Sequence, residues 1–172
     1  MSFFSKLFSR GPDPKETIRP LWHRLVGLAR DPAWYAECKV ADTLEGRFDV
    51  LSTMIALAML RFEQDPKTVP ASARLTELFV EDMEGQLREA GIGDPTVGKK
   101  VGNLVSALGG RTGALREALA QEDNAALAAA MERNITFAEG GSPDCVAEKV
   151  RKLSIVIGGL PYDVLLEAEL QL

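Results

Sequence analysis

The chain has few of the residues from which catalytic and metal sites are built. It has one histidine, His23, and two cysteines, Cys38 and Cys145, within 172 residues. Zinc sites and disulfide frameworks need clustered ligands, and a catalytic dyad needs a histidine with a matched partner. We therefore expect no catalytic residue, metal or cofactor, a surface or half-buried place for His23, and two reduced thiols without a specific role.

Long apolar runs and a net positive charge are also missing. No stretch of about 18 apolar residues occurs, so we expect no transmembrane helix. The opening MSFFSKLFSRGPDP is too short and too interrupted for a secretory signal. A net charge of −5 without a basic stripe argues against a general nucleic-acid binder. These features predict a bacterial cytoplasmic protein.

The charge is nevertheless uneven along the chain. Residues 1–30 carry six cations and two carboxylates, a balance of +4 that leaves −9 for the remainder. Residues 1–12 form an amphipathic basic segment, whose apolar side chains are Phe3, Phe4, Leu7 and Phe8. Two interpretations stay open: a frayed or docked terminus, or a peripheral contact with the inner membrane, which anionic lipid would strengthen by about 1 kcal/mol per cation.

Apolar residues recur with helical spacing through the rest of the chain, and strand-like alternation is nearly absent. Residues 42–63 are apolar almost all round, which is typical of a buried central helix. The sequence thus predicts an all-α fold in which residues 13–172 form a single compact bundle of about six to eight helices. The expected helices span about 14–30, 42–63, 72–90, 95–108, 113–121, 123–139 and 144–158, with a short one after Pro161.

The segment GDPTVGKK, residues 93–100, comes within one residue of the nucleotide-binding pattern G-x-x-x-x-G-K-[ST]. A phosphate loop follows a buried strand and ends in a hydroxyl that holds Mg²⁺. Here a charged helical pattern precedes Gly93, and Lys100 takes the place of the hydroxyl. We interpret the segment as a corner between two helices, with Asp94 as N-cap and Pro95 at the first helical position. A nucleotide-binding enzyme is therefore the weakest hypothesis.

The block ADTLEGRFDVL is the most informative part of the sequence. Asp42 and Glu45 are expected to cap the central helix as a capping pair. Gly46 costs that helix about 1 kcal/mol relative to alanine, which indicates a close approach by another backbone or by a ligand. Arg47 and Asp49 either pair internally, with Asp82 as the expected partner of Arg47, or face a binding partner.

Five blocks together resemble the ubiquinol–cytochrome c chaperone family. They are WY at 34–35, DTLEGRFD at 42–49, FVEDM at 79–83, LREAGIGD at 87–94 and VGKKV at 97–101. The resemblance covers about residues 22–121. It implies a non-enzymatic chaperone that helps to assemble the cytochrome bc1 complex. Its expected partners are cytochrome b or other bc1 subunits, with the ribosome or a second assembly factor as further partners.

This resemblance predicts a groove between helices that holds an apolar client helix. The candidates for its contact surface are Trp34 and Tyr35 as an apolar wall, and Arg47, Asp49, Arg88, Asp94, Lys99 and Lys100 as polar contacts. The alternative is a generic helical adaptor or regulator whose client is unrelated to respiration. A pull-down separates the two hypotheses, because only the first predicts bc1 subunits among the captured proteins.

Overall fold

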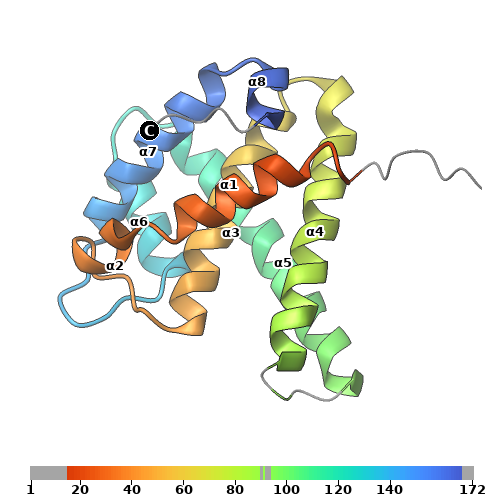
Figure 1. The fold of residues 1–172 in the computed structure, drawn as a ribbon. Helices are drawn as coiled ribbons and strands as arrows, with labels where there is room; N and C mark the ends of the chain where they lie inside the picture. Colours follow the sequence, from red (N-terminus) through yellow and green to blue (C-terminus); the bar gives the residue numbers. More distant parts are fainter. Residues whose placement is uncertain (1–14, 90, 92–93, 168–172) are drawn as a thin grey trace, which may run out of the picture.

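A computed structural model describes residues 15–89, 91 and 94–167, and these residues form an all-helical fold, as predicted (Figure 1). The predicted N-terminal segment with Phe3, Phe4, Leu7 and Phe8 lies outside the described residues. The helices are α1 (Arg19–Ala29), α2 (Pro32–Ala36), α3 (Leu44–Phe62), α4 (Val69–Glu89), α5 (Asp94–Leu119), α6 (Ala125–Asn134), α7 (Pro143–Gly159) and α8 (Tyr162–Leu166), with a 3-10 helix η2 (Pro66–Thr68) before α4.

α3 is the central helix. Every residue from Val50 to Ala58 is buried, and α1, α4, α5 and α7 all contact this helix (Figure 1). Full burial of a large apolar side chain such as Met54 or Ile55 contributes roughly 1.5–3 kcal/mol. The prediction of a central helix is confirmed, and its apolar character on all sides follows from having neighbours on all sides.

α4 and α5 pack against each other and extend past the other helices as a helical hairpin (Figure 1). The sequence predicted a break in the second helix near Gly109 and Gly110, and this prediction was wrong. α5 runs through both glycines to Leu119. Leu108 and Leu115 are buried on either side of the glycine pair, and this burial outweighs a helical cost of about 1 kcal/mol per glycine.

α6 and α7 form the other side of the bundle, where they pack against each other. α6 ends at Asn134, five residues before the predicted end, because the chain becomes extended and Phe137 forms a bridge with Val40. α7 includes the string SIVIGG, which was correctly predicted to be helical. None of the helices in the described ranges is long and apolar enough to cross a membrane.

Candidate functional site

The block at residues 41–51 forms a corner at the start of α3. Thr43, rather than the predicted Asp42, caps the helix: its Oγ1 accepts a hydrogen bond from the Gly46 N–H at 3.2 Å. Asp42 instead accepts a hydrogen bond from Arg47 Nε at 2.7 Å. This bond holds the pKa of the Asp42 carboxyl below its usual value.

The predicted bridge from Arg47 to Asp82 is not formed. Asp82 accepts a hydrogen bond from Gln86 one turn along its own helix, at 2.6 Å. The side chain of Arg47 stays 63% exposed while it pairs with Asp42. The sequence placed both charges on suitable helices, but the relative rotation of those helices decides which carboxylate is within reach.

Gly46 allows the chain before α3 to lie directly on the first turn of the helix. A Cβ added at Gly46 would lie 2.0 Å from the backbone oxygen of Ala41, which is far inside van der Waals contact. The expected close approach of a backbone is therefore present, and that backbone belongs to the chain itself.

Asp49 pairs inside the protein with Arg111 of α5. Asp49 is 8% exposed and Arg111 is 5% exposed, and Arg111 Nη2 donates to Asp49 Oδ1 at 2.8 Å. The second carboxylate oxygen accepts from the backbone N–H of Thr136 at 2.8 Å and from its hydroxyl at 2.7 Å. Both oxygens are thus satisfied, which is the condition under which a buried charge pair is tolerated.

Arg111 extends this network to three helices. It also donates to the Ser52 hydroxyl of α3 and to the carbonyl oxygen of Asn134, the last residue of α6. Its guanidinium lies 5.6 Å from the centre of the Phe48 ring, within the range of a cation–π contact. Burial lowers the pKa of Arg111, and Asp49 opposes this shift. A cation at a helix C-terminus is electrostatically favourable, so Arg111 ties α3 and α5 to the end of α6.

The chain that leads into α3 is attached to the chain that leads into α7. We call residues 37–43 the strap and residues 135–142 the facing loop. Three backbone hydrogen bonds join them: Ala41 N–H to the Thr136 carbonyl at 2.8 Å, Ala138 N–H to the Lys39 carbonyl at 2.9 Å, and Ser142 N–H to the Cys38 carbonyl at 3.0 Å.

Cys38 and Cys145 form a disulfide that links the strap to the first turn of α7. Their Cα atoms are 5.3 Å apart, although the residues are separated by 107 positions in the sequence. The prediction of two reduced thiols without a specific role was wrong. The spacing of two cysteines does not reveal a pairing that the fold creates between distant loops.

The structure places the predicted contact residues in two regions. At the first, Trp34 and Asp49 are buried, so neither offers a surface to a partner in this conformation, contrary to the predicted wall and polar contact. Trp34 donates its indole N–H to the Leu28 carbonyl at 2.8 Å. Tyr35 is half-buried and donates its hydroxyl to the Ala29 carbonyl at 2.8 Å, and desolvation raises its pKa. Only Arg47 is well exposed here.

The second region is the far end of the hairpin formed by α4 and α5. Arg88, Lys99 and Lys100 are exposed there, and Val97 and Val101 are buried between the helices. Asp94 begins α5, and its side chain lies outside what the structure describes. α4 occupies the position in which a phosphate loop would require a strand, so the local fold does not support a nucleotide site at residues 93–100.

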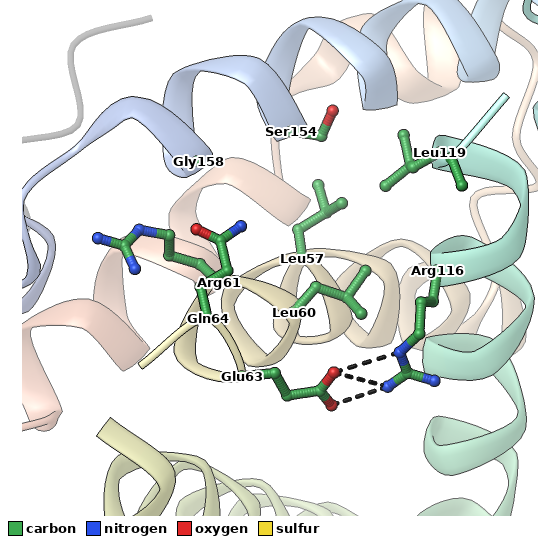
Figure 2. A pocket seen from close by; sticks show the side chains of 10 residues that line it. Leu57, Leu60, Arg61, Glu63, Gln64, Arg116, Leu119, Ser154 and Gly158 are labelled. Atoms are coloured by element: carbon green, nitrogen blue, oxygen red, sulfur yellow. Dashed lines mark hydrogen bonds and ion pairs between the residues drawn. The ribbon is translucent and has the colours of Figure 1, made fainter. Parts of the chain in front are cut away.

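A hollow of about 420 Å³ lies where the C-terminal parts of α3, α5 and α7 meet (Figure 2). Leu57 and Leu60 of α3 and Leu119 of α5 provide apolar side chains to it, while Glu63 and Arg116 form an ion pair at 2.8 Å on its edge. The remaining lining residues are Arg61, Gln64, Ala120, Ser154 and Gly158. Arg61 holds the end of α7 in place by donating to the Leu160 carbonyl at 2.9 Å.

Metal chemistry finds no support in the described part of the chain. No group of three or more histidine, cysteine, aspartate or glutamate residues there could hold an ion. What the described residues do contain is a buried network in which both Asp49 oxygens are hydrogen-bonded and Arg111 Nε has no partner, together with a covalently attached strap and an apolar hollow. These features are suited to holding a shape and presenting a surface.

The family model for the ubiquinol–cytochrome c chaperone matches residues 36–157. The chain belongs to this family. It is also similar to the crystal structure of the Cbp3 homolog from Brucella abortus, with 30% sequence identity, a TM-score of 0.79, and coverage of 96% of this chain and 94% of that chain. A comparison with curated proteins found no match.

The match extends the resemblance seen in the sequence. The resemblance seen in the sequence covered about residues 22–121, whereas the family model continues through α6 and most of α7. The added part contains Thr136 and Cys145, which complete the corner around α3. Arg111 was not predicted as a site residue, although its position between Leu108 and Leu115 on the buried face of α5 was a usable signal of a buried charge.

Proposed function

We propose that the protein is a non-enzymatic chaperone for assembly of the ubiquinol–cytochrome c reductase (bc1) complex, with cytochrome b or another subunit as its client. The single observation that carries this proposal is membership of the ubiquinol–cytochrome c chaperone family. The similarity to the Brucella Cbp3 homolog, which spans nearly the whole of both chains, supports it.

The hollow between α3, α5 and α7 is our candidate for the client site. An apolar client segment needs an apolar concave surface with a polar edge that sets its orientation. Leu57, Leu60 and Leu119 supply the apolar part, and the Glu63–Arg116 pair supplies part of the edge. A volume of about 420 Å³ falls in the range of small-molecule pockets, and the hollow is open to an apolar side chain of a client.

The exposed cations are candidates for a second contact with the assembly machinery. Arg47 lies at the corner, and Arg88, Lys99 and Lys100 lie at the end of the hairpin. Asp94, the acidic residue at the start of α5, is a further candidate for this contact by its place in the sequence. Such residues would steer a partner, a second assembly factor or the ribosome, more than they would hold an apolar helix. We further propose a cytoplasmic protein with peripheral contact at the inner membrane through Phe3, Phe4, Leu7 and Phe8.

The test is complementation of a strain that lacks the gene, with assembled bc1 complex and co-purified subunits as readouts. Leu119→Glu puts a charge into the hollow, and we expect loss of client capture. Leu44→Glu is the matched control, because Leu44 is 55% exposed at the start of α3 and does not line the hollow. Circular dichroism must show that both variants are folded.

The outcomes separate the hypotheses. Loss of capture with Leu119→Glu alone supports the hollow as the client site. If Leu119→Glu still captures the client as well as Leu44→Glu does, the hollow is rejected as the client site, but the chaperone role stays in place. Normal bc1 assembly without the gene, or capture of a client unrelated to bc1, rejects the chaperone role and favours a helical adaptor.

A further inference from the structure

We propose that the Cys38–Cys145 disulfide is a redox-operated latch that controls whether the strap stays attached to the facing loop. This inference is independent of the proposed function, because it concerns only how the strap is held. It starts from the disulfide itself, which joins two loops that are otherwise held together by few contacts.

The strap has few polar attachments to its neighbours besides the apolar packing of Cys38 and Val40 in the core. Three backbone hydrogen bonds join it to the facing loop. The Glu37–Lys149 ion pair at 2.9 Å involves a glutamate side chain that is 64% exposed, and exposed pairs contribute little to stability. α2, which precedes the strap, has only five residues, too few for a helix to persist without tertiary support.

The strap is also held in a conformation that it would not adopt by itself. Lys39 has a φ of +57°, a left-handed conformation that is unfavourable for a residue with a Cβ. Nearby in the strap, the backbone oxygen of Ala41 lies where a Cβ at residue 46 would be, so the strap fits there because residue 46 is glycine. Release of the strap would relieve Lys39, while the disulfide opposes that release by keeping both loops together.

Opening would change the surface of the protein. Cys38 and Val40 of the strap are buried, and Ile135 and Phe137 of the facing loop are buried or partly buried beside them. Separation of the two segments would expose this apolar group next to Arg47. The latch therefore switches between a closed corner and a corner that presents apolar side chains.

The chemistry is thiol–disulfide exchange with a dithiol reductant. Cys38 is fully buried and Cys145 is partly exposed, so attack begins at the sulfur of Cys145 and releases the Cys38 thiolate. The second thiol of the reductant then displaces the Cys145 thiolate, which the N-terminal turn of α7 stabilises. The dithiol becomes a disulfide, and two electrons and two protons pass to the cysteines.

Hydrogen exchange on the full chain, with and without dithiothreitol under native conditions, tests this proposal. The amides of Ala41, Ala138 and Ser142 report on the strap, and those of Met54–Ala58 report on global unfolding. Loss of a cross-link accelerates exchange everywhere through global stability, so the ratio of strap to core rates is the informative quantity. We expect reduction to raise this ratio by at least about tenfold.

A Cys38→Ser/Cys145→Ser variant without reductant should reproduce the reduced protein, since the chain has no other cysteine. If the variant does not fold, natively reduced wild-type protein still decides the question. An unchanged ratio, or an equal acceleration of strap and core, would show that the disulfide only stabilises the whole fold and would overturn the latch.

Discussion

Replacement of Arg111 by methionine should destabilise the protein far more than the same replacement five residues further along α5. Arg111→Met removes the cation that pairs with Asp49 at 2.8 Å and leaves a buried carboxylate without its counter-ion. Removal of one partner of a buried ion pair costs about 3–5 kcal/mol. The variant also loses the contact with the Asn134 carbonyl at the end of α6.

Arg116→Met is the matched control. Arg116 forms a bidentate pair with Glu63, but the two side chains are 53% and 45% exposed. Exposed pairs contribute about 0–1 kcal/mol, and methionine keeps most of the apolar stem. Urea unfolding followed by circular dichroism gives both free energies of unfolding. For a chain of this size, 3–5 kcal/mol lowers the melting temperature by roughly 10 °C.

A second substitution isolates the charge effect. Asp49→Asn keeps an oxygen that can accept from Thr136 but removes the negative charge. In the Arg111→Met background it should recover part of the lost stability, because the unpaired buried charge is then gone. Equal costs for Arg111→Met and Arg116→Met, or strict additivity of the Arg111→Met and Asp49→Asn effects, would refute our account of the network.

Two further predictions follow from the corner and from the tyrosines. Gly46→Ala should lower the free energy of unfolding by about 1–3 kcal/mol in urea unfolding, because the added Cβ meets Ala41. Gly98→Ala, where nothing lies within 4 Å of the added Cβ, should raise the free energy of unfolding by about 0.5–1 kcal/mol. A change of the same sign for both variants would contradict this account of Gly46. Desolvation raises the pKa of Tyr35 and of Tyr162 above the usual 10.0, so both phenols stay protonated to a higher pH in the folded state than in the unfolded state. The free energy of unfolding should therefore fall as the pH rises above 10.0. Near-ultraviolet absorbance should show late ionisation of both tyrosines, with one step lost in Tyr35→Phe; ionisation at the value of free tyrosine would refute it.

Local patterns predicted the helices well where burial and periodicity agree. The apolar run that became α3 and the string SIVIGG in α7 follow a helical period without competing signals. The pattern misled at Gly109 and Gly110, because intrinsic helix propensity there opposes burial of the flanking residues, and burial has the stronger effect on stability. α6 ended early for a similar reason, since residue 137 bridges to a loop far away in the sequence.

The candidate site was less predictable because it depends on contacts between distant segments. The sequence left open whether Asp49 is paired internally or faces a partner, because its ion-pair partner Arg111 lies 62 positions away on a helix whose rotation the sequence does not specify. The disulfide joins residues 107 positions apart, and the hollow arises only where three helix ends converge. Each feature is long-range, whereas spacing rules describe neighbours within a few turns.

The residues that carry the family resemblance at 42–49 mainly build the corner itself. Thr43 caps α3, Gly46 accommodates the strap, Arg47 pairs with Asp42, and Asp49 anchors Arg111. A substitution at Asp49 that abolished client capture would therefore not identify a contact residue, because loss of the buried pair would disturb three helices at once. Contact residues should instead show lost capture at unchanged stability, and the exposed edge of the hollow, at Arg116 and Glu63, is where such variants are expected.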